Sequence, residues 1–209
     1  MPRKPCTAGW DDGRVMRIVA GSAGGRRIEV PPRGTRPTRE RVRESLFSAL
    51  ESALDLSGLR VLDLYAGSGA LGLEALSRGA AQATFVESDR RAARLLRRNA
   101  EKLGLRHVRI EQTTVAAALA ARPREPYDLV LIDPPYAVDS AQLNQEYGLL
   151  VTHGWTAPES LVIVERPVQS DEPRWPEPLV VSRHKNYGDT VVYWAVHAGP
   201  DAALDDAIE

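Results

Sequence analysis

The chain has 209 residues, 43% hydrophobic and 26% charged, and a formal net charge of −1. This length suits one α/β domain with a full core and is too short for two large domains. The single cysteine, Cys6, excludes an intrachain disulfide and a cysteine-rich metal site, and the four histidines lack ligand spacing, so we expect no metal.

The charge of the chain is unevenly distributed. The first 43 residues hold eleven Lys and Arg against four Asp and Glu, a net charge of +7, so the remainder has −8. A basic segment beside an acidic domain suits a polyanion, because Arg and Lys contacts to phosphates supply much of the affinity for nucleic acid. We interpret residues 1–15 as a disordered solvated tail, with Met16 as an alternative start. Residues 16–35 are predicted to form a small β-hairpin that contacts RNA, with strands near 16–20 and 26–30.

The main domain is expected over residues 36–197. It should begin with a helix from Thr38, whose apolar stripe faces a sheet and whose Arg39 and Arg43 lie on another face. Strands and helices then alternate, which predicts a mostly parallel sheet with crossover helices. The strands are expected at 60–65, 83–87, 107–111, 127–132 and 160–164, and the helices at 70–78, 89–103, 114–121 and 139–151.

Two further apolar runs, at 179–183 and 190–196, have no helix between them. They are predicted to add an antiparallel C-terminal hairpin to the sheet, giving seven strands in all. Residues 198–209 read as a flexible acidic tail. We find no secretory signal and no apolar stretch near the ~20 residues that cross a bilayer, so we expect a cytoplasmic protein without membrane contact.

A glycine-rich loop follows the first strand of this domain. Gly67, Gly69 and Gly72 fit the pattern G-x-G-x-x-G, and the acid Glu87 follows about twenty residues after Gly67, at the end of the next strand. Glycines let the backbone turn sharply and approach a ligand, and the acid can accept hydrogen bonds from both hydroxyls of a ribose. Either a dinucleotide or S-adenosylmethionine satisfies this pattern. A dinucleotide enzyme also needs a second mononucleotide-binding half, for which the chain has little room.

The second motif is Asp133-Pro134-Pro135-Tyr136, directly after the apolar run 129–132. Carboxyl ends of strands are where open α/β sheets bind ligands. Prolines fix φ and lack an N–H, so we expect their carbonyls to point outward. The acid and a proline carbonyl can accept both hydrogens of an exocyclic amine, drawing its lone pair out of conjugation, while Tyr136 stacks on the ring. This motif has no role in hydride transfer and favours direct methyl transfer from S-adenosylmethionine.

Together these motifs resemble the class I, Rossmann-like methyltransferases that modify amino groups of nucleobases. The segments 36–47, 17–27 and 187–190 resemble the RsmD family, methyltransferases of small-subunit (16S) ribosomal RNA that modify a guanine N2 amino group. The likeness covers residues 16–196. It implies ribosomal RNA or a partly assembled small subunit as the partner. We expect the protein to act as a monomer.

The resemblance also assigns roles to residues of this chain. The acceptor-side catalytic residues would be Asp133, Pro134, Pro135 and Tyr136. The cofactor-binding residues would be Asp63, Tyr65, Ala66, Gly67, Ser68, Gly69, Glu87, Ser88, Thr113 and Asp133. From the charge pattern of the N-terminal segment, the candidate RNA-binding residues are Arg17, Arg26, Arg27, Arg36, Arg39 and Arg43. Related enzymes often place an acid or amide against the cofactor's adenine, where this chain has Glu111-Gln112-Thr113-Thr114, so several side chains could serve there. We expect Thr114 to cap the next helix instead.

Other functions fit parts of the pattern. A DNA adenine or cytosine amino methyltransferase would use the same tetrapeptide, but the chain has no room for a sizeable target-recognition domain. A protein glutamine methyltransferase more often has Asn in the position of Asp133 and has less need of a basic segment. From a different class, an RNA-binding ribosome assembly factor would need neither the intact glycine loop nor Glu87.

Overall fold

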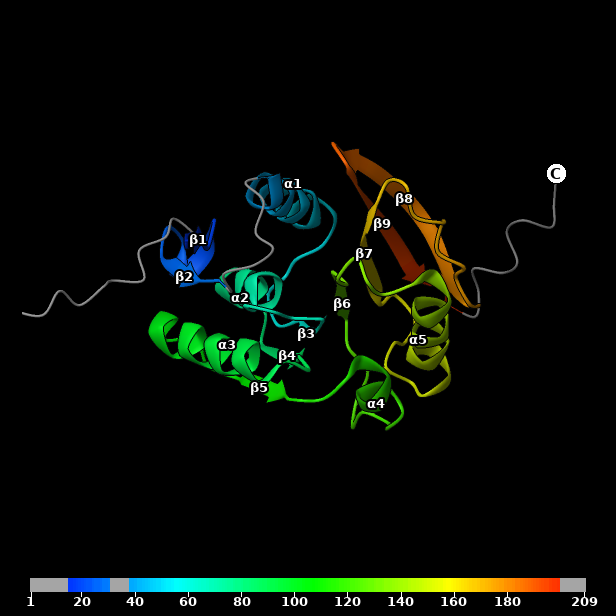
Figure 1. Ribbon diagram of the computed structural model, residues 1–209, viewed down its shortest axis with the longest axis horizontal. Helices are drawn as coiled ribbons and strands as arrows, with labels where there is room; N and C mark the ends of the chain where they lie inside the picture. Colours follow the sequence, from blue (N-terminus) through cyan, green and yellow to red (C-terminus); the bar gives the residue numbers. More distant parts are fainter. Residues whose placement is uncertain (1–14, 31–37, 200–209) are drawn as a thin grey trace, which may run out of the picture.

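The computed structural model describes residues 15–30 and 38–199. Within these residues, seven strands form one sheet in the order β5-β4-β3-β6-β7-β9-β8 (Figure 1). Neighbours from β5 to β7 pair in parallel, and β9 pairs antiparallel with both β7 and β8. The strands are β3 (Arg60–Leu64), β4 (Gln82–Val86), β5 (Val108–Glu111), β6 (Leu129–Ile132), β7 (Leu161–Pro167), β8 (Leu179–Tyr187) and β9 (Thr190–His197).

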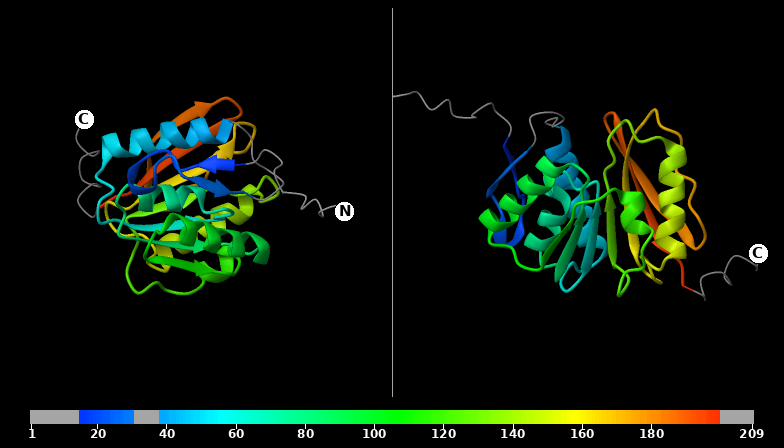
Figure 2. Two further views of the ribbon diagram at one scale, coloured as in Figure 1. Left: turned by 90° about the vertical axis from the view of Figure 1, so that its left-hand side faces the viewer. Right: turned by 60° about the horizontal axis from the view of Figure 1, so that its bottom comes forward.

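Helices cover both faces of this sheet, as Figures 1 and 2 show. One hydrophobic core lies under α1, α2 and α3, and the second lies under α4 and α5. The helices are α1 (Thr38–Ala53), α2 (Ala70–Ser77), α3 (Arg90–Leu103), α4 (Val115–Leu119) and α5 (Ser140–Thr152). The fold is therefore the Rossmann-like α/β fold with a C-terminal antiparallel hairpin that the sequence predicts.

The burial of the central strands explains why their sequences are continuous apolar runs. Every residue of β6 is buried, and four of the five residues of β3 are buried, because helices cover both faces of a parallel sheet. The two ends of α3 are fixed by the residues that flank it. Asp89 accepts hydrogen bonds from the N–H groups of Arg91 and Ala92 at its start, and Gly104 adopts φ 68° at its end. Parallel strands followed by capped helices bring the strand ends to one edge of the sheet.

A small N-terminal hairpin packs on the same side as α1, α2 and α3. Its strands β1 (Val15–Arg17) and β2 (Arg27–Glu29) pair antiparallel and are joined through a short 3-10 turn, η1 (Gly21–Ala23). Ile18 and Ile28 are both 0% exposed and belong to the main core. The hairpin is therefore built into the domain, which supplies the packing that a two-stranded unit lacks on its own.

Polar side chains, in addition to apolar ones, hold the hairpin against the main domain. The Ser77 hydroxyl accepts the N–H of Ala23 (2.9 Å) and donates to the carbonyl of Ala20. The buried Asn99 amide accepts the N–H of Glu29 (2.9 Å) and donates to its carbonyl (2.9 Å). Both side chains come from helices of the main domain, so hairpin and domain share one hydrogen-bonded interior.

The expected strands and helices are confirmed, with differences at their ends. The strand β8 runs on to Tyr187, well beyond the expected end at 183, because its residues pair with β9 up to Tyr187–Thr190. The helix α4 is shorter than the expected range 114–121. The proposed tails at 1–14 and 200–209, and the linker at 31–37, lie outside the described residues.

Candidate active site

The glycine loop connects β3 to α2 and takes a shape that only small residues allow. Gly67 and Gly69 have φ values of 54° and 81°, in the region that L side chains rarely adopt. Gly72 has ordinary backbone geometry, but a Cβ there would lie 2.4 Å from the ring of Phe85. The loop can therefore pass close over the strand ends, where a ligand would lie.

Asp63 anchors this loop from inside. Its Oδ2 accepts the N–H of Gly72 at 2.9 Å, and the residue is only 2% exposed. Burial raises the pKa of the Asp63 carboxyl to about 7, the hydrogen bond from Gly72 opposes this shift, and the negative charges of Asp133 and Glu87 add to it. The carboxyl is therefore poised to ionise when a positive charge arrives.

Glu87 anchors the loop from the end of β4. Its Oε2 accepts the N–H of Gly67 at 2.8 Å, while Oε1 accepts the N–H of Asp89 at 2.6 Å. These two bonds hold the carboxylate in a fixed orientation at the rim of the site. Each oxygen keeps a further lone pair that can accept a hydroxyl.

The Asp-Pro-Pro-Tyr loop follows β6 at the same edge of the sheet. Pro134 is buried, whereas the Tyr136 side chain is 56% exposed, unusually high for a large aromatic residue. Pro135 accepts the N–H of Val138 at 3.0 Å, so its carbonyl closes a turn within the loop. The expectation that both proline carbonyls point outward is thus wrong for Pro135, and the Pro134 carbonyl is the one we retain as an acceptor.

One cavity of about 860 Å³ joins these segments. Its lining includes the expected residues Asp63, Tyr65, Ala66, Gly67, Ser68, Glu87, Ser88, Thr113, Asp133, Pro134, Pro135 and Tyr136. Gly69 does not line it; this residue packs against Leu96 and only shapes the turn. The glycine loop and the tetrapeptide therefore face one cleft, which is large enough for a nucleoside-sized ligand and part of a second one.

Thr113 and Thr114 both line the cleft near Val115. The Thr114 hydroxyl accepts the N–H of Ala117 at 3.2 Å and so caps α4, as the sequence predicts. Its side chain is thereby committed to the helix. Thr113 and Ser88 remain the candidates for polar contact to a base in this part of the cleft.

Several residues that line the cleft have no sequence motif. Glu165 directly follows the buried run of β7, which is the same signal that singled out Asp133 after β6. Gln142 comes from α5, and Met16 and Leu46 come from the hairpin and α1. No sequence pattern identifies these last three, because the topology alone brings them to the strand ends.

Tyr65 connects the two sides of the cleft. It has φ 59°, and its hydroxyl lies 2.6 Å and 2.8 Å from the two carboxylate oxygens of Glu146 in α5, to which it donates. Gln142 Nε2 donates to the same carboxylate at 3.0 Å. Burial and the Glu146 carboxylate raise the pKa of Tyr65 far above its usual value. The ring is therefore a neutral, fixed wall between the glycine loop and α5.

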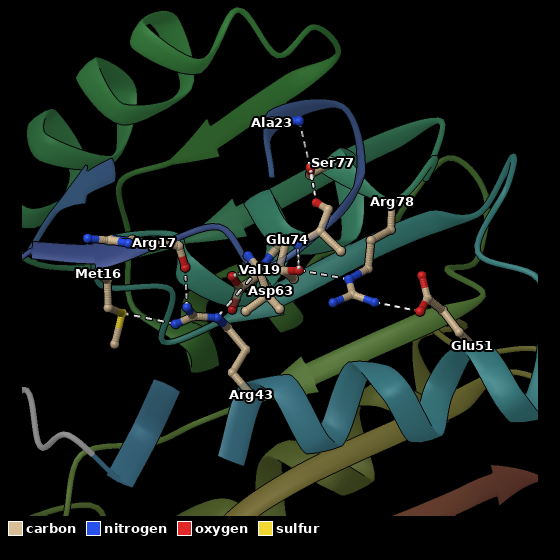
Figure 3. Close-up of polar contacts among 12 residues, drawn as sticks. Met16, Arg17, Val19, Ala23, Arg43, Glu51, Asp63, Glu74, Ser77 and Arg78 are labelled. Atoms are coloured by element: carbon tan, nitrogen blue, oxygen red, sulfur yellow. Dashed lines mark hydrogen bonds and ion pairs between the residues drawn. The ribbon is translucent and has the colours of Figure 1, made fainter. Parts of the chain in front are cut away.

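Arg43 was expected to present its charge to RNA, and this expectation is wrong. The residue is only 3% exposed, because its guanidinium points inward beneath the hairpin (Figure 3). It donates to the Arg17 carbonyl and to Met16 Sδ (3.0 Å), and its Nε lies 3.7 Å from Glu74 Oε2. Arg43 thus ties α1 to the hairpin and lines the cleft from inside.

The buried Glu74 of α2 is the centre of this polar cluster. Its Oε2 accepts the N–H of Val19 at 2.7 Å and its Oε1 accepts the N–H of Ala20 at 3.1 Å. Arg78 Nε donates to Oε1 at 2.7 Å, and Arg78 also pairs with Glu51 (Figure 3). Two arginines and two backbone amides compensate the buried carboxylate, which fixes the hairpin beside the cleft.

The other candidate RNA-binding arginines differ in their surroundings. Arg17 and Arg27 are exposed on the hairpin. Arg26 is also exposed, but its guanidinium donates to the carbonyls of Leu103 (2.6 Å) and Lys102 at the end of α3, so it caps a helix. Arg36 and the side chain of Arg39 lie outside the described residues. Arg17 and Arg27 are therefore the pair best placed to meet a phosphate.

Two other kinds of site are absent from the described residues. Among them, no group of three or more His, Cys, Asp or Glu side chains is arranged to hold a metal ion. Within the same residues, every helix is too short or too polar to cross a membrane.

Comparison with known proteins gives consistent matches over most of the chain. A family model described as conserved hypothetical protein 95 matches residues 16–196. Ribosomal RNA small subunit methyltransferase D of Escherichia coli (strain K12) is 38% identical over 174 residues, which cover 83% of this chain and 85% of that protein.

Two solved structures also match most of the chain. The Escherichia coli protein yhhF, described as a candidate methyltransferase, has a TM-score of 0.79 and 34% identity, covering 89% of this chain and 99% of its own. Magnesium protoporphyrin IX methyltransferase (ChlM) from Synechocystis PCC 6803, solved with bound S-adenosylmethionine, has a TM-score of 0.61 at 13% identity, over 77% of this chain and 80% of its own. The second likeness concerns the fold alone.

Proposed function

Because the chain belongs to the RsmD family, the family described as conserved hypothetical protein 95, we propose that it methylates a guanine N2 amino group in small-subunit (16S) ribosomal RNA. The coarser statement follows from the family itself: the protein is a methyltransferase of ribosomal RNA that uses S-adenosylmethionine. The observation that supports the finer proposal is the single cleft shared by the glycine loop and Asp133–Tyr136.

The donor half of the cleft fits S-adenosylmethionine. This cofactor, when bound, supplies an electrophilic methyl group on a positively charged sulfur. Glu87, oriented by the N–H groups of Gly67 and Asp89, would accept the two ribose hydroxyls. Asp63 would accept the amino group of the methionine portion, and its raised pKa fits a carboxyl that awaits a cation. Ser88 and Thr113 would meet the adenine.

The acceptor half would hold the target base. The Asp133 carboxylate and the Pro134 carbonyl would each accept one hydrogen of the exocyclic amine, so that the nitrogen lone pair turns toward the methyl group. Tyr136, 56% exposed, offers a ring face on which an unstacked base can lie.

The chemistry needs little more than this orientation. The bound cofactor would supply the methyl carbon to which the nitrogen bonds, and the electron pair of the broken carbon–sulfur bond would stay with sulfur. The nitrogen then loses its extra proton, which has become acidic, through Asp133 to water. Asp133 acts chiefly as an orienting acceptor, and positioning supplies most of the acceleration.

The substrate would be ribosomal RNA or a partly assembled small subunit, met in the cytoplasm by a monomeric enzyme. Arg17 and Arg27, exposed on a hairpin that also contributes Met16 to the cleft, are placed to contact phosphates beside the target. This arrangement favours a nucleic acid over a protein glutamine side chain as the acceptor.

Transfer of tritium from labelled S-adenosylmethionine tests this proposal. Small subunits and naked 16S RNA from a strain lacking the protein would be the acceptors, with duplex DNA as a third acceptor. We expect incorporation into the small-subunit RNA and, after nuclease digestion, a single N2-methylguanosine. Incorporation into DNA only, or into a base other than guanine, would contradict the proposal.

A further inference from the structure

A second carboxylate, Glu165, lines the same cleft as Asp133. In the sheet, Ile132 of β6 and Val164 of β7 are the last register partners, and Asp133 and Glu165 are the residues that directly follow them. Neighbouring parallel strands lie about 4.8 Å apart, and residues in register point to the same face. Asp133 and Glu165 both line the cleft, together with Pro134 and Tyr136.

The face on which these two residues lie also fits. Two residues earlier in the same strands, Leu131 and Ile163 belong to the core beneath α1 and α2, and side chains alternate along a strand. Glu165, which is still within β7, therefore lies on that face, and Asp133 extends it directly after the end of β6. This is the side on which Asp63 meets the glycine loop.

Ionised carboxylates accept hydrogen bonds, so a base that presents two neighbouring donors matches this pair best. The base edges differ in this respect. Guanine has its N1–H directly beside its 2-amino group. Adenine and cytosine have a ring nitrogen lone pair beside the amino group, which would face a carboxylate without a shared hydrogen.

We propose that Glu165 is the residue that selects guanine, by accepting N1–H while Asp133 accepts the amino group. This inference rests on the proposed function and gives it a structural reason for preferring guanine to adenine and cytosine. An opposed lone pair and carboxylate repel each other, and the hydrogen bond that guanine N1–H would make is lost. Sites built to bind an N–H reject analogues that lack it by up to about 10⁴-fold.

The test compares guanine with 2-aminopurine, which keeps the 2-amino group but has a lone pair at N1. Small subunits would be reconstituted with either base at the mapped target position, and kcat/KM would be measured for each. The wild-type protein should prefer guanine by about 100-fold or more. In Glu165→Gln the amide can turn its NH₂ toward the lone pair, so the preference should fall at least about tenfold, chiefly through better use of 2-aminopurine.

Glu125→Gln is the matched control. This carboxylate is 66% exposed, pairs with Arg60 and lies before β6, at the opposite edge of the sheet from the cleft. The same loss of charge there should leave the guanine preference unchanged. Calorimetry with S-adenosylmethionine would show whether the Glu165 variant keeps its cofactor site and fold.

The outcomes separate the inference from the function beneath it. If the wild-type protein methylates guanine and Glu165→Gln lowers activity on both bases in equal proportion, the selection role is wrong and the proposed function stands. The selection role of Glu165 is also wrong if the wild-type protein methylates 2-aminopurine as readily as guanine. If it transfers no methyl group to guanine in any RNA, the proposed function itself fails.

Discussion

The cleft has a donor wall, formed by the glycine loop with Asp63 and Glu87, and an acceptor wall, formed by Asp133–Tyr136, and the two are built in different ways. The donor wall is tied together by its own chain: Asp63 accepts a backbone N–H of the glycine loop, and so does Glu87. The acceptor wall exposes its aromatic ring, since Tyr136 is 56% exposed and follows two prolines. The donor wall is thus organised before any ligand arrives, whereas in the proposed complex the target base would cover the exposed ring of the acceptor wall.

The largest expected effect comes from removing the orienting acid of the acceptor wall. Asp133→Ala should reduce kcat by about 10²–10³-fold, because the amino group loses the carboxylate that turns its lone pair toward the methyl group. Cofactor affinity should stay nearly unchanged, since the donor wall keeps its own hydrogen bonds. Single-turnover transfer and calorimetry measure the two quantities, and an equal loss of both would contradict the division into two walls.

The opposite pattern is expected on the donor wall. Glu87→Ala removes the acceptor for the ribose and releases the Gly67 N–H, so cofactor affinity should fall by about 10–100-fold, as for the loss of one charge-assisted hydrogen bond. Turnover at saturating cofactor should recover most of its wild-type value. Glu101→Ala, an exposed change on α3, is the control for lost charge and should alter neither quantity. A turnover that stays low at saturating cofactor would assign Glu87 to the chemical step.

Protonation of Asp63 should link cofactor affinity to pH. Its pKa of about 7 in the free protein should fall when a cationic amino group binds, so binding releases a proton. Affinity should therefore weaken by up to about tenfold for each pH unit below 7 and level off above it. Calorimetry in buffers of different ionisation enthalpy measures the proton release, which Asp63→Asn should abolish. A pH-independent affinity in the wild-type protein would contradict the contact.

The same group has the reverse effect on the stability of the free protein. The folded pKa of Asp63 lies above its ordinary value of 3.8, so the folded state binds more protons than the unfolded chain between these values. Its contribution to stability is full below about pH 4 and is lost as the pH rises through about 7. Ionisation of Asp63 therefore destabilises the free protein, and a bound cation would remove this destabilisation.

Sequence alone identified the parts of the cleft that follow directly from a strand. Asp133 and Glu87 were readable because each comes straight after a buried apolar run, and parallel strands bring such residues to one edge. Glu165 follows the buried run 161–164 within β7 in the same way, but no motif drew attention to it. The rule is therefore more general than the motifs that revealed it.

The arginines show where sequence reasoning stops. Helical periodicity placed Arg43 off the apolar face of α1, yet its partner Glu74 lies thirty-one residues further on and draws the charge inward. Arg26 was read as a phosphate ligand, but its guanidinium caps α3. A charge on the surface and a charge paired in the interior have the same sequence pattern, because the difference depends on contacts between distant segments.

The smallest effect is expected from the exposed arginines of the hairpin, outside both walls. Replacing Arg17 and Arg27 with Ala should weaken RNA binding at low salt and reduce the slope of log affinity against log salt by about 1–2, since each phosphate contact contributes about 0.7–0.9. Cofactor affinity should not change. The matched control is the double change of Arg122 and Arg124 to Ala, two exposed arginines at the opposite edge of the sheet. An equal loss of slope in both variants would mean that overall charge, and not the hairpin, attracts the RNA.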